Sequence, residues 1–163
     1  MDYLVEAVLS FLAAVAFGVL FNAPRRMLIH CGVVGTVGWL VFSISRSQTD
    51  DQVVATFLGA FTIALLSHIF ARRRKMPMIL FSVTGIIVLV PGSSAYNAMR
   101  HVVEQDYLTA IELGTRALLI SGAIAMGLVF AEIIMQIYSK VYGRLTKKKK
   151  TDALVNIEDT RQL

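Results

Sequence analysis

The chain has 163 residues, of which 56% are hydrophobic and 17% charged, with a formal net charge of +5 and a mean hydropathy of +0.65. Soluble domains carry about 25% charged residues, and here long uncharged stretches alternate with short charged clusters, so the composition excludes an ordinary soluble domain and predicts membrane spans joined by loops. The single cysteine, Cys31, lies in an apolar stretch without metal-ligand spacing, so we expect no internal disulfide and no metal there. We expect no cofactor.

Five segments are apolar enough to predict transmembrane helices, since a span needs roughly 20 mostly apolar residues. In chain order they cover residues 3–21, 27–45, 53–71, a fourth that starts at residue 78, and a fifth within 108–138. Asn22 is expected to cap the end of the first helix. We therefore predict an all-α integral membrane bundle, with a transmembrane domain over residues 1–143 and a basic, disordered cytoplasmic tail over residues 144–163.

The fourth segment is expected to be broken. Its apolar part, residues 78–90, would cover only about 20 Å as a helix, which is too short to cross a membrane. Pro91 and Gly92 predict the end of one half-helix, and Ser93 or Ser94 is expected to cap a second. The alternative is a plain loop at the outer face after a short or tilted span.

A broken helix inside a membrane favours a binding site, because non-helical backbone at that depth is tolerated only against protein or a water-filled cavity. The N–H groups that begin a half-helix can hold a substrate carboxylate. The candidate substrate-binding residues of this segment are Pro91, Gly92, Ser93, Ser94, Tyr96 and Asn97.

The basic residues predict the orientation. With the N-terminus outside, five spans place thirteen lysines and arginines on the cytoplasmic side, in clusters of two, four and seven, and only Arg46 and Arg100 on the outer side. This positive-inside bias favours an outer N-terminus and an inner C-terminus. We expect the last cluster, which includes Lys147, Lys148, Lys149 and Lys150, to contact anionic lipid and not nucleic acid.

Ionisable residues inside spans are costly and are therefore candidates for function. Glu112 and Arg116 lie four residues apart in the fifth segment, in the order that favours a helix ion pair. The pair is either structural, or Arg116 binds a substrate carboxylate when Glu112 releases it. Glu132 lies deeper in the same segment, where it either carries a coupling proton or extends to the inner interface.

Small residues recur at helical spacing, which lets helices approach closely in lipid. They form one series in the second segment and two in the fifth: Gly32, Gly35 and Gly38; Ala117, Ser121 and Ala125; and Ala123, Gly127 and Ala131. These series indicate either general packing of the bundle or the docking of a second subunit.

Two sequence blocks carry a resemblance to a known family. The first, Phe-Asn-Ala-Pro-Arg-Arg at residues 21–26, leads into a segment with Cys31, Gly32 and Gly35. The second, Val-Pro-Gly-Ser-Ser-Ala-Tyr-Asn-Ala-Met, occupies residues 90–99. With the five-span layout, these blocks resemble the small-subunit form of the threonine/serine exporter family, over about residues 3–140.

The resemblance implies a function and a partner. Members of this family export threonine and serine, and some two-subunit relatives export succinate. Split members pair a small subunit with a larger one that carries its own membrane half and a cytoplasmic domain. The chain is thus expected to be one half of a secondary exporter of small carboxylate-bearing metabolites in the bacterial inner membrane, acting with a larger subunit or as a homo-oligomer. Two halves of opposite topology with a site between them are a known transporter plan.

The sequence leaves the substrate open. An acid that binds an ammonium group would separate an amino acid from a dicarboxylate, and the sequence does not show whether Glu112 faces the site. One alternative function is a membrane scaffold that stabilises or regulates its partner. Another is an intramembrane hydrolase that uses Ser94, but no histidine is spaced to activate that serine, so we do not expect an enzyme.

Overall fold

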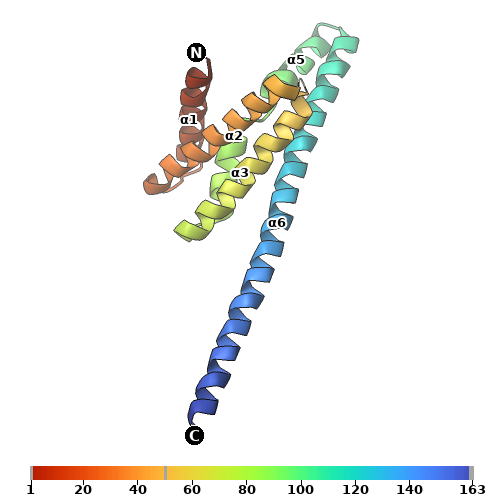
Figure 1. The fold of residues 1–163 in the computed structure, drawn as a ribbon. Coiled ribbons are helices and arrows are strands. Elements are labelled where there is room, and N and C mark those ends of the chain that lie inside the picture. Colours follow the sequence, from red (N-terminus) through yellow and green to blue (C-terminus); the bar gives the residue numbers. More distant parts are fainter. Residues whose placement is uncertain (1, 50, 162–163) are drawn as a thin grey trace. The chain divides into compact units, whose positions relative to one another are not determined.

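The computed structural model describes the backbone of residues 2–49 and 51–161 and the side chains of residues 3–49 and 51–140. Within these ranges the chain is helical and has no strand, which confirms the all-α prediction (Figure 1). The elements in chain order are α1 (Asp2–Leu20), the short 3-10 helix η1 (Arg25–Met27), α2 (Leu28–Thr49), α3 (Gln52–Arg74), α4 (Met78–Ile86), α5 (Gly92–Val103) and α6 (Tyr107–Arg161). The chain divides into two units, residues 1–131 and 132–163, and each is described by itself.

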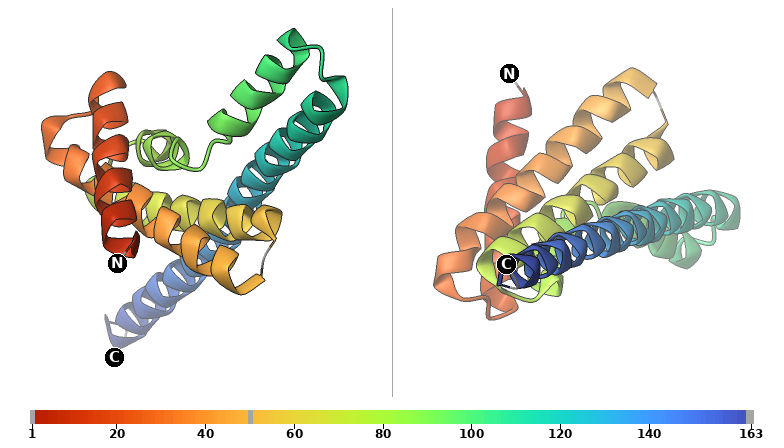
Figure 2. Two further views of the ribbon diagram at one scale, coloured as in Figure 1. Left: turned by 90° about the horizontal axis from the view of Figure 1, so that it is seen from above. Right: turned by 60° about the horizontal axis from the view of Figure 1, so that its bottom comes forward.

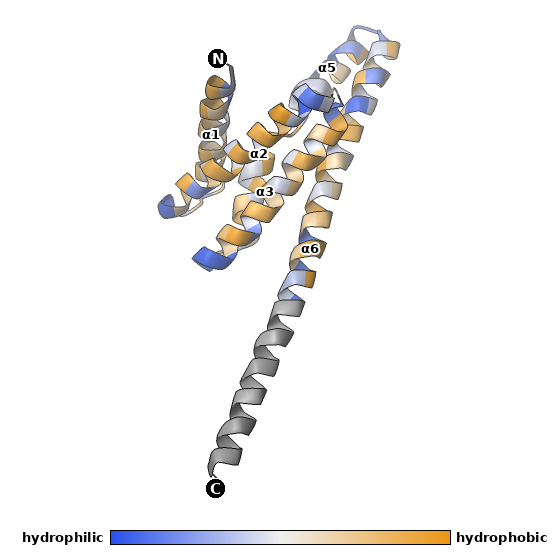
Figure 3. Cartoon of the chain, in the orientation of Figure 1, coloured by the Kyte–Doolittle hydropathy of each residue, from blue (hydrophilic) through white to orange (hydrophobic). Residues whose placement is uncertain are grey.

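Four helical stretches of the described chain are long and apolar enough to cross a membrane: Tyr3–Leu20, Arg25–Thr49, Gln52–Arg74 and Tyr107–Lys140. Figure 3 shows the apolar residues that dominate them. The fourth predicted segment is not among them, because it is divided into α4 with nine residues and α5 with twelve. A multi-pass membrane protein follows, whereas five crossings and their orientation stay predictions.

Three helices end in the same way. Asn22, Lys75 and Gln105 follow α1, α3 and α5 and adopt left-handed backbone, with φ of 55°, 52° and 62°. In each case the next residue's N–H donates to the carbonyl five residues before it, at 2.9 to 3.2 Å. This closure satisfies carbonyl groups that a helix end leaves without partners. Asn22 therefore ends the first helix as expected, through its backbone.

The sixth helix begins at a capping aspartate. The N–H of Thr109 donates to Oδ1 of Asp106 at 3.3 Å. Hydrogen bonds from the side chain and then the backbone of Thr109, with a smaller contribution from His101, hold the pKa of Asp106 below its ordinary value.

The tail differs from the sequence expectation. Disorder was expected from residue 144, but helical backbone continues to Arg161, and the four lysines, two leucines and one alanine of this stretch are good helix formers. The side chains of residues 147–150 lie outside the described residues, so their contact with anionic lipid stays a prediction.

The glycines of α2 pack inside the chain. A Cβ on Gly35 would lie 2.6 Å from Cβ of Ala14 on α1, and a Cβ on Gly32 would overlap the Phe11 ring. A Cβ on Gly38 would overlap Ile63 on α3. This series therefore serves the close approach of α2 to α1 and α3.

The two series of small residues on α6 differ in burial. Ala123, Gly127 and Ala131 are buried, whereas Ser121 and Ala125 are exposed and Ala117 is half-buried. The backbone of α3 lies against Gly127, so the buried series packs α6 on α3 at this residue.

Helices α1 to α4 pack against one another. Helix α2 contacts α1 and α3, and α4 packs against all three (Figures 1 and 2). Glu6 at the start of α1 bonds to Ser43 near the end of α2, and Arg116 bonds to Gln52 at the start of α3. These residues lie at the same end of α2 and α3. His30 and Arg74, which are also in contact, lie at the opposite end of α2 and α3.

Candidate functional site

The break in the fourth segment begins earlier than the sequence predicted. Helix α4 ends at Ile86 and α5 starts at Gly92, so the interruption covers residues 87–91 and does not start at Pro91. The N–H of Leu89 donates to the carbonyl of Ile86 at 2.7 Å, which tightens the chain after α4. Proline also disfavours helical backbone at the residue before it, which is Val90. Figure 2 shows α4 end-on and α5 from the side, so the two half-helices run in different directions.

The start of α5 is not capped by a serine. The residue before the helix is Pro91, without a side-chain cap bond, so the prediction that Ser93 or Ser94 caps α5 is wrong. The N–H of Gly92 donates to the carbonyl of Val90 at 2.8 Å. The N–H groups of Ser93 and Ser94 belong to the first turn, where the helix itself supplies no acceptor.

A pocket of 270 Å³ lies at this break, and we call it the break pocket. Three predicted site residues line it: Pro91, Ser93 and Ser94. Its other lining residues come from three helices and from the break itself: Trp39, Phe42, Arg46, Gln52, Thr56, Ile120, Val88, Leu89 and Val90. The break pocket therefore combines apolar walls with one guanidinium, one amide and three hydroxyl groups.

The remaining predicted residues of α5 lie elsewhere. Gly92, Tyr96 and Asn97 are exposed and do not line the break pocket. Tyr96 is 69% exposed.

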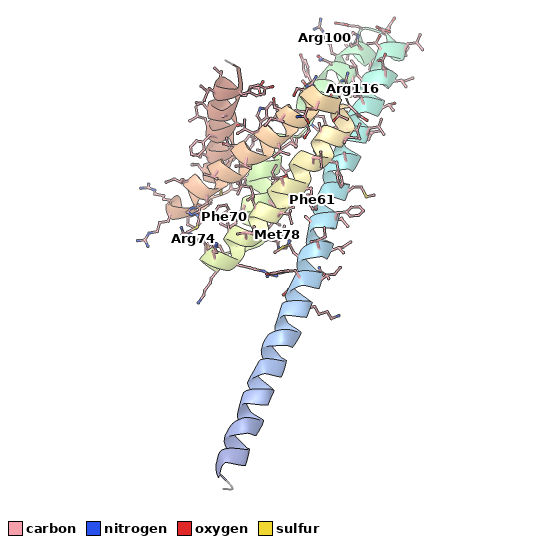
Figure 4. All side chains as sticks on the ribbon, in the orientation of Figure 1. Phe61, Phe70, Arg74, Met78, Arg100 and Arg116 are labelled. Carbon is pink, nitrogen blue, oxygen red and sulfur yellow. The ribbon has the colours of Figure 1, made fainter. Side chains whose placement is uncertain are left out.

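Arg116 is hydrogen-bonded to a residue that lines the break pocket. Nε and Nη2 of Arg116, which Figure 4 labels, donate to Oε1 of Gln52 at 3.0 and 2.6 Å. Gln52 in turn lines the pocket. Among the described salt bridges there is none between Arg116 and Glu112. The guanidinium thus turns across to α3 instead of along its own helix.

The two predicted carboxylates do not line the break pocket. Glu112 is exposed on α6. Glu132 belongs to the second unit, where Nε2 of Gln136 donates to its Oε1 at 3.3 Å.

Sequence reasoning missed a carboxylate on α1. Oε2 of Glu6 accepts hydrogen bonds from Oγ of Ser43 at 2.7 Å and from Nε1 of Trp39 at 3.2 Å. Glu6 lines a pocket of 450 Å³, which we call the Glu6 pocket, together with Tyr3, Trp39, Phe42, Ser43, Arg46 and Ser47. A signal was present, because Glu6 is the only charged residue in the first apolar segment.

The Glu6 pocket and the break pocket are neighbours. Trp39, Phe42 and Arg46 line both of them. Arg46 therefore lies beside both pockets.

Two further groups of polar side chains in the described part of the chain line neither the Glu6 pocket nor the break pocket. Nη2 of Arg74 lies 2.9 Å from Nε2 of His30, whose ring meets Phe70 edge-on at 5.3 Å between centroids. Figure 4 labels Arg74 and Phe70. Nδ1 of His101 lies 3.6 Å from Glu104 and 3.5 Å from Asp106 in the turn before α6. Among the described residues, no group of three or more histidine, cysteine or acidic side chains could hold a metal.

The fold and the site define a multi-pass helical membrane protein with a polar pocket at a broken helix, which is an arrangement found in transporters. The sequence matches the family described as Threonine/Serine exporter, ThrE, over residues 6–134. The chain belongs to this family, and the match confirms the resemblance found in the sequence. The family is one of exporters, not of enzymes. No solved structure matches the chain.

Proposed function

We propose that the chain is a membrane subunit of a secondary exporter of small carboxylate-bearing metabolites, namely amino acids of the threonine and serine type or succinate. In this proposal it acts with a larger membrane partner in the bacterial inner membrane. The observation that carries the proposal is the break pocket, where the interruption between α4 and α5 lies beside polar residues of α2 and α3.

The lining of the break pocket suits a carboxylate. Ser93 and Ser94 line the pocket and belong to the first turn of α5, where the helix dipole is positive and N–H groups lack helical acceptors. Arg46 contributes a guanidinium, which can bind a carboxylate with two parallel hydrogen bonds. Arg116 adds a second positive charge beyond Gln52. Non-helical backbone in a membrane is tolerated where it lines such a cavity.

The course of the chain supports five crossings. Three residues separate the end of α3 from the start of α4, and Arg116 near the start of α6 bonds to the first residue of α3. The broken segment therefore runs from one end of α3 to the other, and the 23 residues of α3 span about 34 Å. With the positive-inside distribution of charge, this course favours an outer N-terminus and an inner C-terminus. A partner half of opposite topology would complete the transporter.

Export from cells tests this proposal. Release of labelled threonine, serine and succinate would be compared for cells with this chain alone, a candidate larger subunit alone, and both. We expect export only when both are present. Export by this chain alone would contradict the need for a larger partner and favour a homo-oligomer. No export in any combination, with both proteins detected in the membrane, would contradict the exporter.

A variant pair separates an exporter subunit from a scaffold. Ser94→Ala removes a hydroxyl from the break pocket, and loss of a hydrogen bond to a charged group should reduce export about tenfold. Asn97→Ala on the same helix changes an exposed side chain outside the pocket and should leave export unchanged. Equal export by the two variants would favour a chain that only supports its partner.

A further inference from the structure

The carboxylate of Glu6 is hydrogen-bonded through only one of its two oxygens in the described part of the chain. Ser43 and Trp39 on α2 both donate to Oε2, across the contact between α1 and α2. No donor among the described residues is hydrogen-bonded to Oε1. A carboxylate held in this way keeps one oxygen in a fixed position for a further donor.

Glu6 and Arg46 are oppositely charged groups that line the same pocket. Neither forms a salt bridge with another described residue, nor do they pair with each other. Glu6 also lines a second pocket of 260 Å³ with Leu9, Ser10, Ala13, Trp39 and Val88. Because an ionised carboxylate beside apolar walls is costly without a cationic partner, the position favours a ligand that supplies one.

The charges of a zwitterion fit this arrangement. An α-amino acid carries a carboxylate that Arg46 can bind and an ammonium group with three N–H donors for Glu6. A dicarboxylate would instead bring a second negative charge toward Glu6, and like charges in a pocket disfavour binding.

We propose that Glu6 binds the ammonium group of the substrate and makes the exporter prefer α-amino acids to dicarboxylates. Arg46, which lines both pockets, holds the substrate carboxylate between them. This inference rests on the proposed function and assigns the ammonium-binding acid that the sequence left open. Glu112, the acid considered from the sequence, lines neither the Glu6 pocket nor the break pocket.

The test compares two labelled metabolites in cells that contain this chain with its larger partner. Glu6→Gln keeps an oxygen that can accept from Ser43 and Trp39 but removes the negative charge. We expect the ratio of threonine export to succinate export to fall about tenfold or more, the scale of one lost charge-assisted hydrogen bond. Glu6→Asp keeps the charge and should keep the preference for threonine even where the rate falls. Glu104→Gln removes one negative charge in the turn before α6 and should leave the ratio unchanged.

The outcomes separate the two proposals. A ratio of threonine to succinate export in Glu6→Gln equal to that of the wild type would overturn the inference. If both exports fell equally, with the protein present in the membrane, Glu6 would be assigned to packing or proton coupling. A wild-type exporter that prefers succinate would also overturn the inference. Absence of all export by the wild-type pair would instead contradict the proposed function itself.

Discussion

Replacing Gly127 by alanine should force α6 away from α3. A Cβ at this position would lie 2.8 Å from the carbonyl oxygen of Phe57, 3.0 Å from the amide nitrogen of Phe61 and 3.1 Å from Cβ of Ala60. The first two atoms are backbone, so no side-chain rotation relieves the contact. Since ordinary contact begins at 3.4 Å, the helices must separate by about 0.6 Å, the difference between 3.4 and 2.8 Å.

The expected cost is clearest against a matched variant. Overpacking of this kind costs about 1–3 kcal/mol, while alanine in place of glycine stabilises a helix by about 1 kcal/mol. Gly122→Ala on the same helix gains helix propensity without overpacking, because a Cβ there has no neighbour within 4 Å. The difference in the free energy of unfolding between Gly127→Ala and Gly122→Ala should therefore be about 1–3 kcal/mol, since the helix-propensity effect cancels.

Thermal unfolding of the purified chain in detergent micelles measures this difference. For a chain of this size each kcal/mol shifts the melting temperature by roughly 2–4 °C. Gly127→Ala should melt several degrees below Gly122→Ala. Equal melting temperatures, or a higher value for Gly127→Ala, would refute the close packing of α6 on the backbone of α3.

The remaining predictions concern the site and the start of α6. Pro91→Ala should let helical backbone extend into the break and reduce export at unchanged membrane level, as measured with labelled threonine; unchanged export would contradict a role for the break. Gln52→Ala and Arg116→Ala should reduce export non-additively, because Gln52 positions the guanidinium; additive losses in the double variant would mean that the two residues act separately. The pKa of Asp106 is lowered, so its stabilisation of α6 is present above its ordinary pKa of 3.8 and is lost as the pH falls through the lowered value. Hydrogen exchange in the first turn of α6 should therefore accelerate on acidification relative to Asp106→Asn at the same pH, and equal protection in the two proteins at every pH would show that the cap contributes nothing.

Hydropathy predicted most of the elements, because membrane helices are defined by long apolar stretches. It placed α1, α2 and α3 within a few residues of their bounds, and it predicted that the fourth segment is interrupted. It did not predict where the interruption starts, because the apolar residues 87–90 carry no signal that separates helix from turn. Their conformation follows from the proline after them and from the turn that closes on Ile86.

The candidate site was only partly predictable. Pro91, Ser93 and Ser94 were identified from the local break and do line the break pocket. Glu112 was considered because it lies four residues from Arg116, but Arg116 bonds to a residue 64 positions away. Local spacing on one helix cannot show which helix will lie opposite it.

The sequence by itself determined that this protein is a membrane protein, where its long apolar helices lie and that the apolar segment after residue 78 is interrupted. Only the tertiary structure decided that Glu6 meets Trp39 and Ser43, which are 33 and 37 residues away. The reason is that membrane insertion depends on summed hydropathy along each segment, whereas the pairing of side chains depends on how the helices are rotated against one another. That rotation is set by contacts such as Gly35 on Ala14 and Gly38 on Ile63, which bring α2 close to α1 and α3.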